Sequence, residues 1–301
     1  MRIIFTLLLC LWFGPASAQW GEGRGWLTGV GWLPLARAPV GGAYTGPGDI
    51  QSGALAWYGL RGYNAAYSTG SNPAVDLVDQ AGANTITINI LANGNLDTAS
   101  ISAWVTAHSV TTINITRCYD QSGNGNHAVQ ATLANMPTLT LSGLGSLPIM
   151  TTSATPLFLL APTTLTAPQP FSMSGIADRT TGASLQFFFA TSNTTGMAGD
   201  GTNSFTLYAG NTNDVTAANN AYHAVQGLFN GVSSSIQIDG TLTTGQNAGA
   251  QTASAQPVIG GGNSGGGFPF PGNILEVGIW SGDQSSHFSA MNSNQHTYWG
   301  F

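Results

Sequence analysis

The sequence contains no lysine, and only 6% of its 301 residues are charged, far below the roughly 25% of an ordinary soluble domain. Nucleic acids and anionic membranes are bound by clustered basic side chains, and the six arginines are scattered along the chain. These absences argue against nucleic acid as a partner. A surface made of Thr, Ser, Asn, Gln and Gly suits neutral glycans, and it equally suits a coat or adhesive protein.

Cysteine is almost absent as well. Cys10 lies in an N-terminal apolar stretch, and Cys118 lies in an apolar run typical of a strand. If the first is removed by processing, no intramolecular disulfide remains, and we expect Cys118 to be a buried thiol rather than a reactive one. Hydrophobic residues make up 42% of the chain, which is ample material for a core and argues against disorder.

Long apolar runs are missing except at the start. Arg2 precedes the apolar stretch Ile3–Phe13, and small residues follow up to Ala18, as in a secretory signal peptide. A buried helix or a membrane anchor is the alternative, but the stretch is too short for a bilayer and Gly14-Pro15 would break a longer helix. We predict a signal peptide over 1–18 and an extracellular, periplasmic or cell-surface location without membrane insertion. The processed chain would hold five arginines against twelve acidic residues, a net charge of −7.

Residues 19–48 are rich in Gly and Trp without a period, and we interpret them as an irregular N-terminal arm. From residue 49 to 301, short β-branched or aromatic runs alternate with turn residues, which predicts strands. We expect an all-β jelly-roll sandwich of two antiparallel sheets in one domain. The predicted strands are Ala54–Leu60, Val75–Val78, Thr85–Ile90, Thr111–Tyr119, Thr138–Leu141, Phe171–Ala177, Leu185–Ala190, Ser204–Ala209, His223–Asn230, Ser234–Ile238, Pro257–Ile259 and Ile274–Trp280.

Two segments break this rhythm. Asp97 is a good N-cap for a short helix that presents Ile101 and Trp104 on one face. The final run from Gln284 to Trp299 is expected to hold one or two helical turns.

The most distinctive string is Tyr119-Asp120-Gln121-Ser122-Gly123-Asn124-Gly125-Asn126-His127. The two glycines permit positive φ, and Asp120 can accept backbone N–H bonds across the turn. A hydrogen-bonded structural loop is the main interpretation. The alternative is a loop whose Asp120 or His127 contacts a ligand.

This string resembles the signature of the catalytic domain of α-L-arabinofuranosidase B enzymes. The upstream segment 52–61 (SGALAWYGLR) is similar to that family's opening segment, and 258–264 (VIGGGNS) to its Gly-Ile-Gly-Gly-Asp-Asn-Ser run. The closing segment 270–280 resembles the last strand of laminin-G and concanavalin-like sandwiches. The resemblance implies a concanavalin-like jelly roll, a retaining arabinofuranosidase ancestry and arabinose-bearing polysaccharide as the family substrate.

The departures from this family concern its catalytic acids. A retaining glycosidase needs a carboxylate nucleophile and a carboxylic acid/base, and neither amides nor hydroxyls replace them. Where the family has the acid/base aspartate after the paired glycines, this chain has Gly262. The family's nucleophile is a glutamate in the middle of the domain, but here glutamate occurs only as Glu22 and Glu276. We expect the inherited mechanism to be lost.

Other residues remain as site candidates. Asp200 and Asp214 flank the strand predicted over 204–209, near where the family's nucleophile strand falls, and are the alternative catalytic pair. Tyr208 and Tyr222 can stack on sugar rings, although ordinary sheet packing explains them equally. Asn263 is a further candidate for carbohydrate binding.

No His, Cys, Asp and Glu residues show the spacing of a zinc site, and a rim calcium site built from separate loops cannot be read from one sequence. Three hypotheses follow. The first is a secreted, catalytically impaired relative of arabinofuranosidase B that binds neutral glycans. The second is an active α-L-arabinofuranosidase with a relocated carboxylate pair, and the third is a passive structural or adhesive surface protein.

Overall fold

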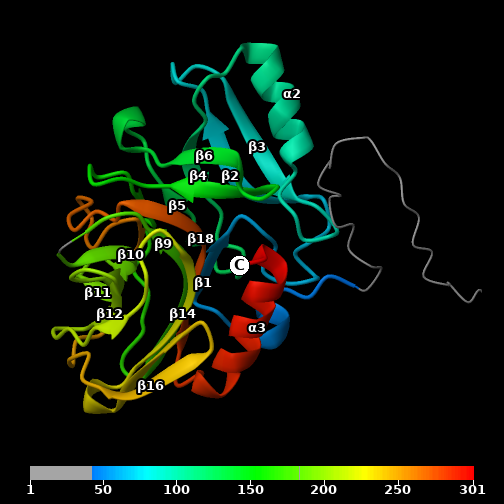
Figure 1. Cartoon of the computed structure of the whole chain (residues 1–301). Helices are drawn as coiled ribbons and strands as arrows, with labels where there is room; N and C mark the ends of the chain where they lie inside the picture. The colour runs from blue at the N-terminus through cyan, green and yellow to red at the C-terminus, as the bar shows by residue number, and fades with distance from the viewer. Residues whose placement is uncertain (1–42, 183) are drawn as a thin grey trace, which may run out of the picture. The chain divides into compact units, whose positions relative to one another are not determined.

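The computed structural model describes residues 43–182 and 184–301, and every strand pairing between its named strands is antiparallel. The predicted signal peptide and residues 19–42 of the predicted arm lie outside the described residues. The described strands form one hydrogen-bonded sheet of 18 strands that folds into layers (Figure 1). No helix in the described part of the chain is long and apolar enough to cross a membrane.

The first layer has the strand order β16–β15–β14–β9–β18–β1. Its strands are β16 (Thr241–Gln246), β15 (Ser234–Ile238), β14 (Tyr222–Phe229), β9 (Phe171–Arg179), β18 (Gly272–Ser281) and β1 (Ala56–Gly59). The second layer has the order β8–β17–β10–β11–β12–β13. Its strands are β8 (Leu159–Leu160), β17 (Pro257–Ile259), β10 (Gln186–Thr191), β11 (Thr195–Gly199), β12 (Ser204–Tyr208) and β13 (Val215–Thr216).

A smaller upper layer connects the two and has the order β3–β2–β4–β6–β7. Its strands are β3 (Thr85–Ile90), β2 (Asn72–Val78), β4 (Asn114–Cys118), β6 (Thr138–Leu144) and β7 (Leu147–Thr151). The short strand β5 (Ala128–Val129) joins β4 to β8, and β7 joins β18. The predicted all-β sandwich of antiparallel sheets is confirmed.

The two main layers enclose an aromatic core. Phe188 of β10 packs edge to face against Phe205 of β12, with ring centroids 5.7 Å apart. Gly227 of β14 leaves room for Leu207 of the facing layer, since a Cβ there would lie 2.5 Å from the leucine side chain. Full burial of each such phenylalanine stabilises the fold by roughly 3 kcal/mol.

All twelve predicted strands are present, and six further ones were not predicted. Among these, β11 (TGMAG) has a composition that disfavours strands, and it is held by pairing with β10 and β12 on either side. Asp239 and Gly240 form the hairpin turn that joins β15 to β16, and their φ angles are 49° and 84°.

The helices of the structure agree with the sequence predictions to different degrees. Helix α2 (Thr98–His108) is confirmed, with the Asp97 side chain accepting a hydrogen bond from the Ser100 N–H at 3.1 Å and with Ile101 and Trp104 buried. The described part of the predicted arm includes helix α1 (Pro47–Ile50), and Tyr44 packs on Tyr298 at 6.2 Å. Helix α3 (Phe288–Trp299) is much longer than the one or two turns expected.

Cys118 is buried, as expected. Burial, and then the nearby Asp76 carboxylate, raise the pKa of its thiol to about 12, so the thiolate needed for reactivity is scarce at neutral pH.

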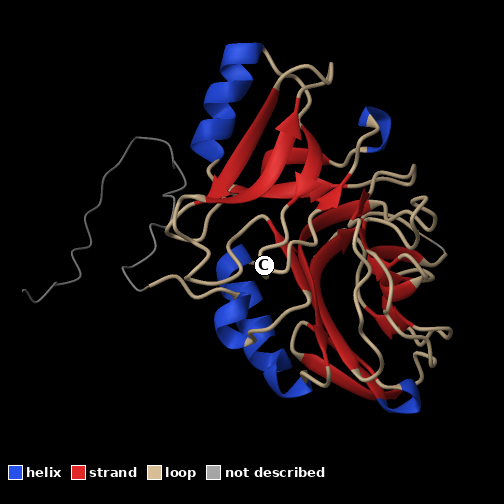
Figure 2. Cartoon of the chain, turned by 180° about the vertical axis from the view of Figure 1, so that it is seen from behind, coloured by secondary structure: helices blue, strands red, loops and turns tan. Residues whose placement is uncertain are grey.

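Helix α3 covers the outer face of the first layer (Figure 2) and meets a buried ion pair there. Arg61 donates from Nη2 to Glu276 Oε1 at 2.8 Å and from Nε to Oε2, and both side chains are 0% exposed. The same carboxylate accepts hydrogen bonds from Gln295 Nε2 at 2.9 Å and Trp299 Nε1 at 3.0 Å, both on α3. Burial alone would lower the pKa of Arg61, but the Glu276 carboxylate outweighs that effect and raises it.

We predict that Glu276→Gln lowers the free energy of unfolding by roughly 3–5 kcal/mol, because it leaves the Arg61 charge buried without its counter-charge. Urea denaturation at neutral pH measures this change. Adding Arg61→Met to the same chain should restore part of the stability, since no charge then remains buried. A loss below about 1 kcal/mol for Glu276→Gln would contradict a structural role for the pair.

Candidate functional site

The outer face of the second layer carries a row of side chains that point away from the core. The register pairs Phe187 with Ala198 and Ala198 with Thr206, so these three lie side by side on one face, and Tyr208 lies two residues further along β12. Phe205 and Leu207, which flank Thr206 in the sequence, point into the core. This alternation places the partly exposed Tyr208 ring beside the fully buried side chains of Ala198 and Thr206.

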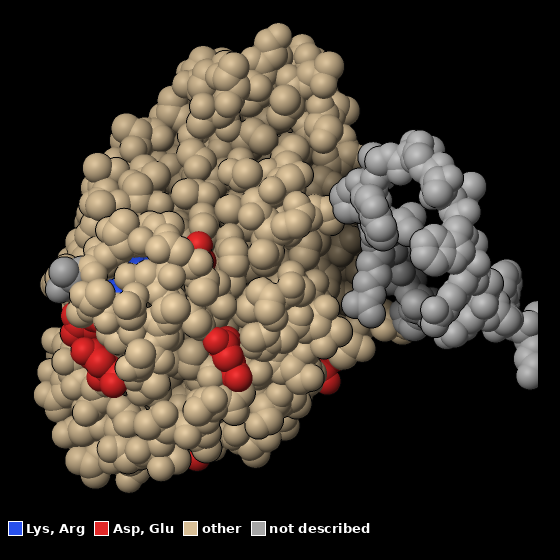
Figure 3. All heavy atoms as spheres, viewed as in Figure 1, with Lys and Arg blue, Asp and Glu red and all other residues tan. Residues whose placement is uncertain are grey.

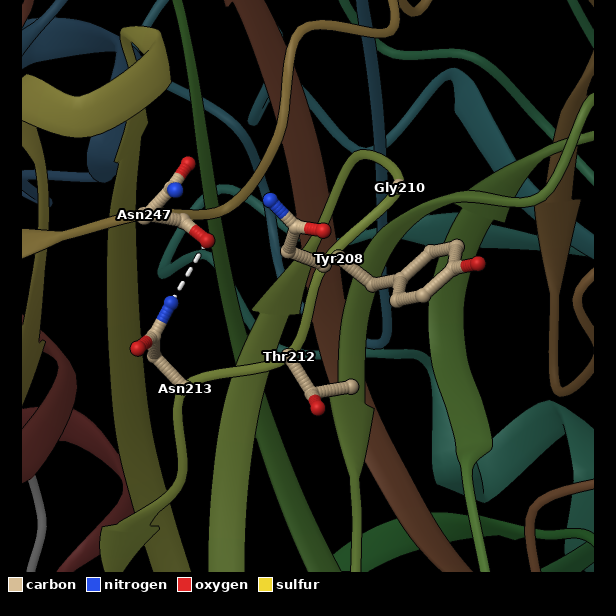
Figure 4. A pocket seen from close by; sticks show the side chains of 6 residues that line it. Tyr208, Gly210, Thr212, Asn213 and Asn247 are labelled. Atoms are coloured by element: carbon tan, nitrogen blue, oxygen red, sulfur yellow. Dashed lines mark hydrogen bonds between the residues drawn. The ribbon is translucent and has the colours of Figure 1, made fainter.

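An open basin of about 550 Å³ lies beside Tyr208 (Figure 4). Asn213 shapes it, because its backbone N–H donates to the Thr206 hydroxyl at 2.9 Å and its side-chain Nδ2 donates to the Asn247 carbonyl at 2.5 Å. The basin offers amide and hydroxyl groups together with one aromatic ring, and none of its lining residues carries a charge at neutral pH. The lining residues are Tyr208, Gly210, Asn211, Thr212, Asn213 and Asn247.

Gly262 lies against Phe187, the first residue of this row. Its N–H donates to the Gly267 carbonyl at 2.7 Å, and a Cβ at this position would lie 2.6 Å from the Phe187 ring and 3.2 Å from the Phe268 ring. Phe187 contacts Phe268 and Tyr208 edge to face, with centroids 6.0 and 5.9 Å away. Aromatic side chains therefore fill the space around the glycine.

Asp200 and Asp214 are brought together at the start of β12, beside the buried Arg179. Arg179 donates from Nη2 to the Gly201 carbonyl at 3.0 Å, and both carboxylates favour its charge, although burial lowers the pKa of Arg179 overall. Burial, and then the Asp200 carboxylate, raise the pKa of Asp214, while the Thr206 hydroxyl lowers it. The pair thus lies next to a cation, and neither carboxylate is among the lining residues of the basin.

The other two sugar-binding candidates lie in different surroundings. Tyr222 is on β14 in the first layer, where its ring packs against Phe301 at 5.9 Å, and burial together with Asp178 raises its pKa to about 12. Asn263 accepts backbone hydrogen bonds from Gly265 at 3.0 Å and Gly267 at 2.9 Å, which fixes the glycine loop. Only Tyr208 of the three lines the basin.

The loop Tyr119–His127 is organised around Asp120. One carboxylate oxygen accepts the N–H groups of Trp57 and Ser122, and the other accepts that of Asn126, each at 3.0 Å. The Asp120 N–H in turn donates to His127 Nδ1 at 3.0 Å. Because Asp120 is buried and both oxygens are bonded inside the protein, the geometry describes a structural residue.

The amides of the same loop hold the segment 54–63. Gln121 accepts from the Tyr63 N–H at 2.8 Å and donates to the Gly59 carbonyl at 2.9 Å, while Asn124 donates to the Ala54 carbonyl at 2.9 Å. Two of the segments that carry the family resemblance are therefore one hydrogen-bonded unit. The basin residues Asn211, Thr212, Asn213 and Asn247 were not predicted, and an Asn/Thr-rich stretch directly after a strand was their only signal.

Among residues 43–182 and 184–301, no three His, Cys, Asp or Glu side chains gather closely enough to hold a metal ion. The calcium site considered from the sequence stays untested.

No protein-family model matches the sequence, and no curated protein matches it either. Several solved structures share its fold. An arabinofuranosidase complexed with arabinofuranosyl-α-1,2-xylobiose aligns with a TM-score of 0.63 at 20% identity. A GH54 α-L-arabinofuranosidase soaked with a cyclic sulfate inhibitor aligns with a TM-score of 0.64 at 19% identity. In both cases the alignment covers 83% of this chain but 64% of the other, which is less than two thirds of the enzyme. The arabinofuranosidase-like fold expected from the motif is confirmed at this level.

We predict that Asp120→Asn lowers the free energy of unfolding by roughly 3 kcal/mol, because an amide nitrogen replaces one of two acceptors for buried N–H groups. Asp97→Asn is the matched control, since asparagine caps a helix as well as aspartate and should change stability by less than about 0.5 kcal/mol. Chemical denaturation of both variants makes the comparison. Equal losses would show that Asp120 has no special structural role.

Proposed function

We propose that this protein binds a neutral glycan in the basin beside Tyr208 without efficiently cleaving it. The observation that carries the proposal is the uncharged lining of the basin, where amide and hydroxyl groups lie beside one partly exposed tyrosine ring. Sugar hydroxyls are recognised by such donors and acceptors, and an aromatic face packs against the C–H groups of a sugar ring.

The charge distribution supports a neutral ligand. Figure 3 shows a face on which acidic atoms form small separate groups and basic atoms are barely visible. The chain has no lysine, and of the three arginines among the described residues, Arg61, Arg117 and Arg179, the first and last are buried. An anionic polysaccharide would meet no basic surface at the basin.

The surroundings of Gly262 support weak or absent catalysis. No carboxylate stands at this position, and the space that one would need is taken by Phe187 and Phe268. Glu276 is the only glutamate among the described residues, and its carboxylate is engaged in the buried ion pair with Arg61. Without a nucleophile and a proton donor the retaining reaction has no route.

An active arabinofuranosidase is the second candidate, and the Asp200–Asp214 pair is the observation that favours it. One carboxyl of a catalytic pair keeps its proton when its pKa is raised, and the pKa of Asp214 is raised by burial and by Asp200. Arg179 lies beside the pair and acts to lower the pKa of Asp214, which weakens the case for a catalytic pair.

A passive structural or adhesive surface protein is the third candidate, favoured by the scarcity of charge. Under all three, we propose that residues 1–18 direct export, that 19–48 form an arm, and that the sandwich acts outside the cell.

We predict that Tyr208→Ala weakens binding to the glycan that the protein retains on a glycan array at least tenfold, as expected for losing roughly 1.5 kcal/mol of ring contact. Tyr222→Ala removes a tyrosine of the other layer and should leave the affinity within twofold. Calorimetry on both variants measures the difference. The absence of saturable binding to any neutral glycan would favour the passive scaffold instead.

We predict no enzymatic release of 4-nitrophenol from 4-nitrophenyl α-L-arabinofuranoside above the rate of a boiled sample. If release is observed, Asp214→Asn and Asp200→Asn decide its origin. Loss of activity in both variants, with stability retained, would establish the relocated pair and overturn the non-catalytic proposal.

A further inference from the structure

Asp239 lies between two histidines from different elements. Its Oδ2 is 2.6 Å from His223 Nδ1, and its Oδ1 is 3.3 Å from His296 Nε2. Oδ1 also accepts the Ala224 N–H at 2.9 Å. Since Asp239 belongs to the β15–β16 turn, His223 to β14 and His296 to α3, the three side chains connect the hairpin, the first layer and the C-terminal helix.

The second nitrogen of each imidazole also faces an acceptor. His223 Nε2 lies 2.9 Å from the Ala218 carbonyl, and His296 Nδ1 lies 2.7 Å from the Phe301 carbonyl. A neutral imidazole has one N–H and can satisfy only one of its two neighbours, whereas an imidazolium satisfies both. Both ring contacts of His223 are hydrogen bonds, so its geometry matches the doubly protonated form. Nε2 of His296 makes no hydrogen bond, and its 3.3 Å contact with Asp239 is an ion pair when the ring is protonated.

The other groups around the rings do not oppose this charge. His223 packs edge to face on Phe205 at 5.6 Å, and His296 packs on Phe301 at 4.5 Å. Asp178 of β9 is the further charged group that acts on His223, and it favours the imidazolium. His296 lies in the last turn of α3, where the helix dipole also favours a cation.

We propose that His223, Asp239 and His296 form an acid-engaged clamp that fastens α3 to the first layer and makes the protein most stable in mildly acidic surroundings. The clamp closes when both rings are protonated and Asp239 is ionised. It loosens as the pH rises and the His223 ring loses its second proton.

The pKa directions agree with this geometry. Burial alone would lower the pKa of His223, but Asp239 and the Ala218 carbonyl raise it above its ordinary value. Its contribution is therefore complete below the unfolded pKa near 6.5 and is lost as the pH rises through the folded value. Burial alone would raise the pKa of Asp239, but His223 lowers it, so that contribution is lost only as the pH falls below about 3.8. The clamp is complete between these limits.

Hydrogen exchange of the full chain tests the proposal. After correction for intrinsic exchange, the opening constant of the α3 amides should rise between pH 5.5 and pH 8, by up to tenfold for each pH unit by which a folded histidine pKa exceeds its unfolded value. Asp239→Asn should flatten this dependence. This variant keeps the hairpin, because Asn-Gly is the preferred pair for such a turn and its amide oxygen can still accept the Ala224 N–H.

His296→Gln should also reduce the slope, whereas His108→Gln, on the exposed end of α2, should leave it unchanged. Histidine titrations by NMR give a second measurement that does not depend on stability. Apparent pKa values of His223 and His296 that stay the same in Asp239→Asn would overturn the clamp. An α3 opening constant that is independent of pH in the unmodified chain would overturn it too.

Discussion

The buried ion pair between Arg61 and Glu276 is the interaction on which the arrangement of this domain depends. The two residues are 215 positions apart, and their pairing joins the segment after β1 to the closing strand β18. A charge of either sign left alone in that interior would cost several kcal/mol, so the segments must meet there or not fold. Helix α3 adds two hydrogen bonds to the ion pair, since Gln295 and Trp299 donate to the Glu276 carboxylate.

The same logic explains why the family resemblance lies where it does. The segment that begins at Ala54 leads directly into Arg61, and its backbone groups are hydrogen-bonded to the side chains of Asp120, Gln121 and Asn124. These hydrogen bonds hold the strands in place and take no part in a reaction. A chain can therefore keep these residues and this fold whether or not it keeps a glycosidase activity. The shared fold at 19–20% identity with arabinofuranosidases is compatible with a different activity for that reason.

Local patterns predicted much of the fold, and long-range pairings did not. Thr85–Ile90 and Ser234–Ile238 were predicted to the residue because β-branched runs end at turn residues. Strand β11 was missed because neighbouring strands, not its own residues, hold it extended. Helix α3 was underestimated because its polar side chains are satisfied by Glu276 and Ser174, which no local window contains. The basin was not predicted because Asn247 reaches it from a loop far along the chain, whereas Tyr208 was named as a candidate from its strand alone.

The Phe187 and Phe268 rings limit which side chains the position of Gly262 can hold. An aspartate introduced at this position would have to displace Phe187, which is fully buried, and Phe268, whose backbone has a φ of 57°. Its carboxylate would then sit among apolar rings, which disfavour the charged form. The space around Gly262 is filled by aromatic rings, so one substitution cannot both introduce a carboxylate there and make room for it.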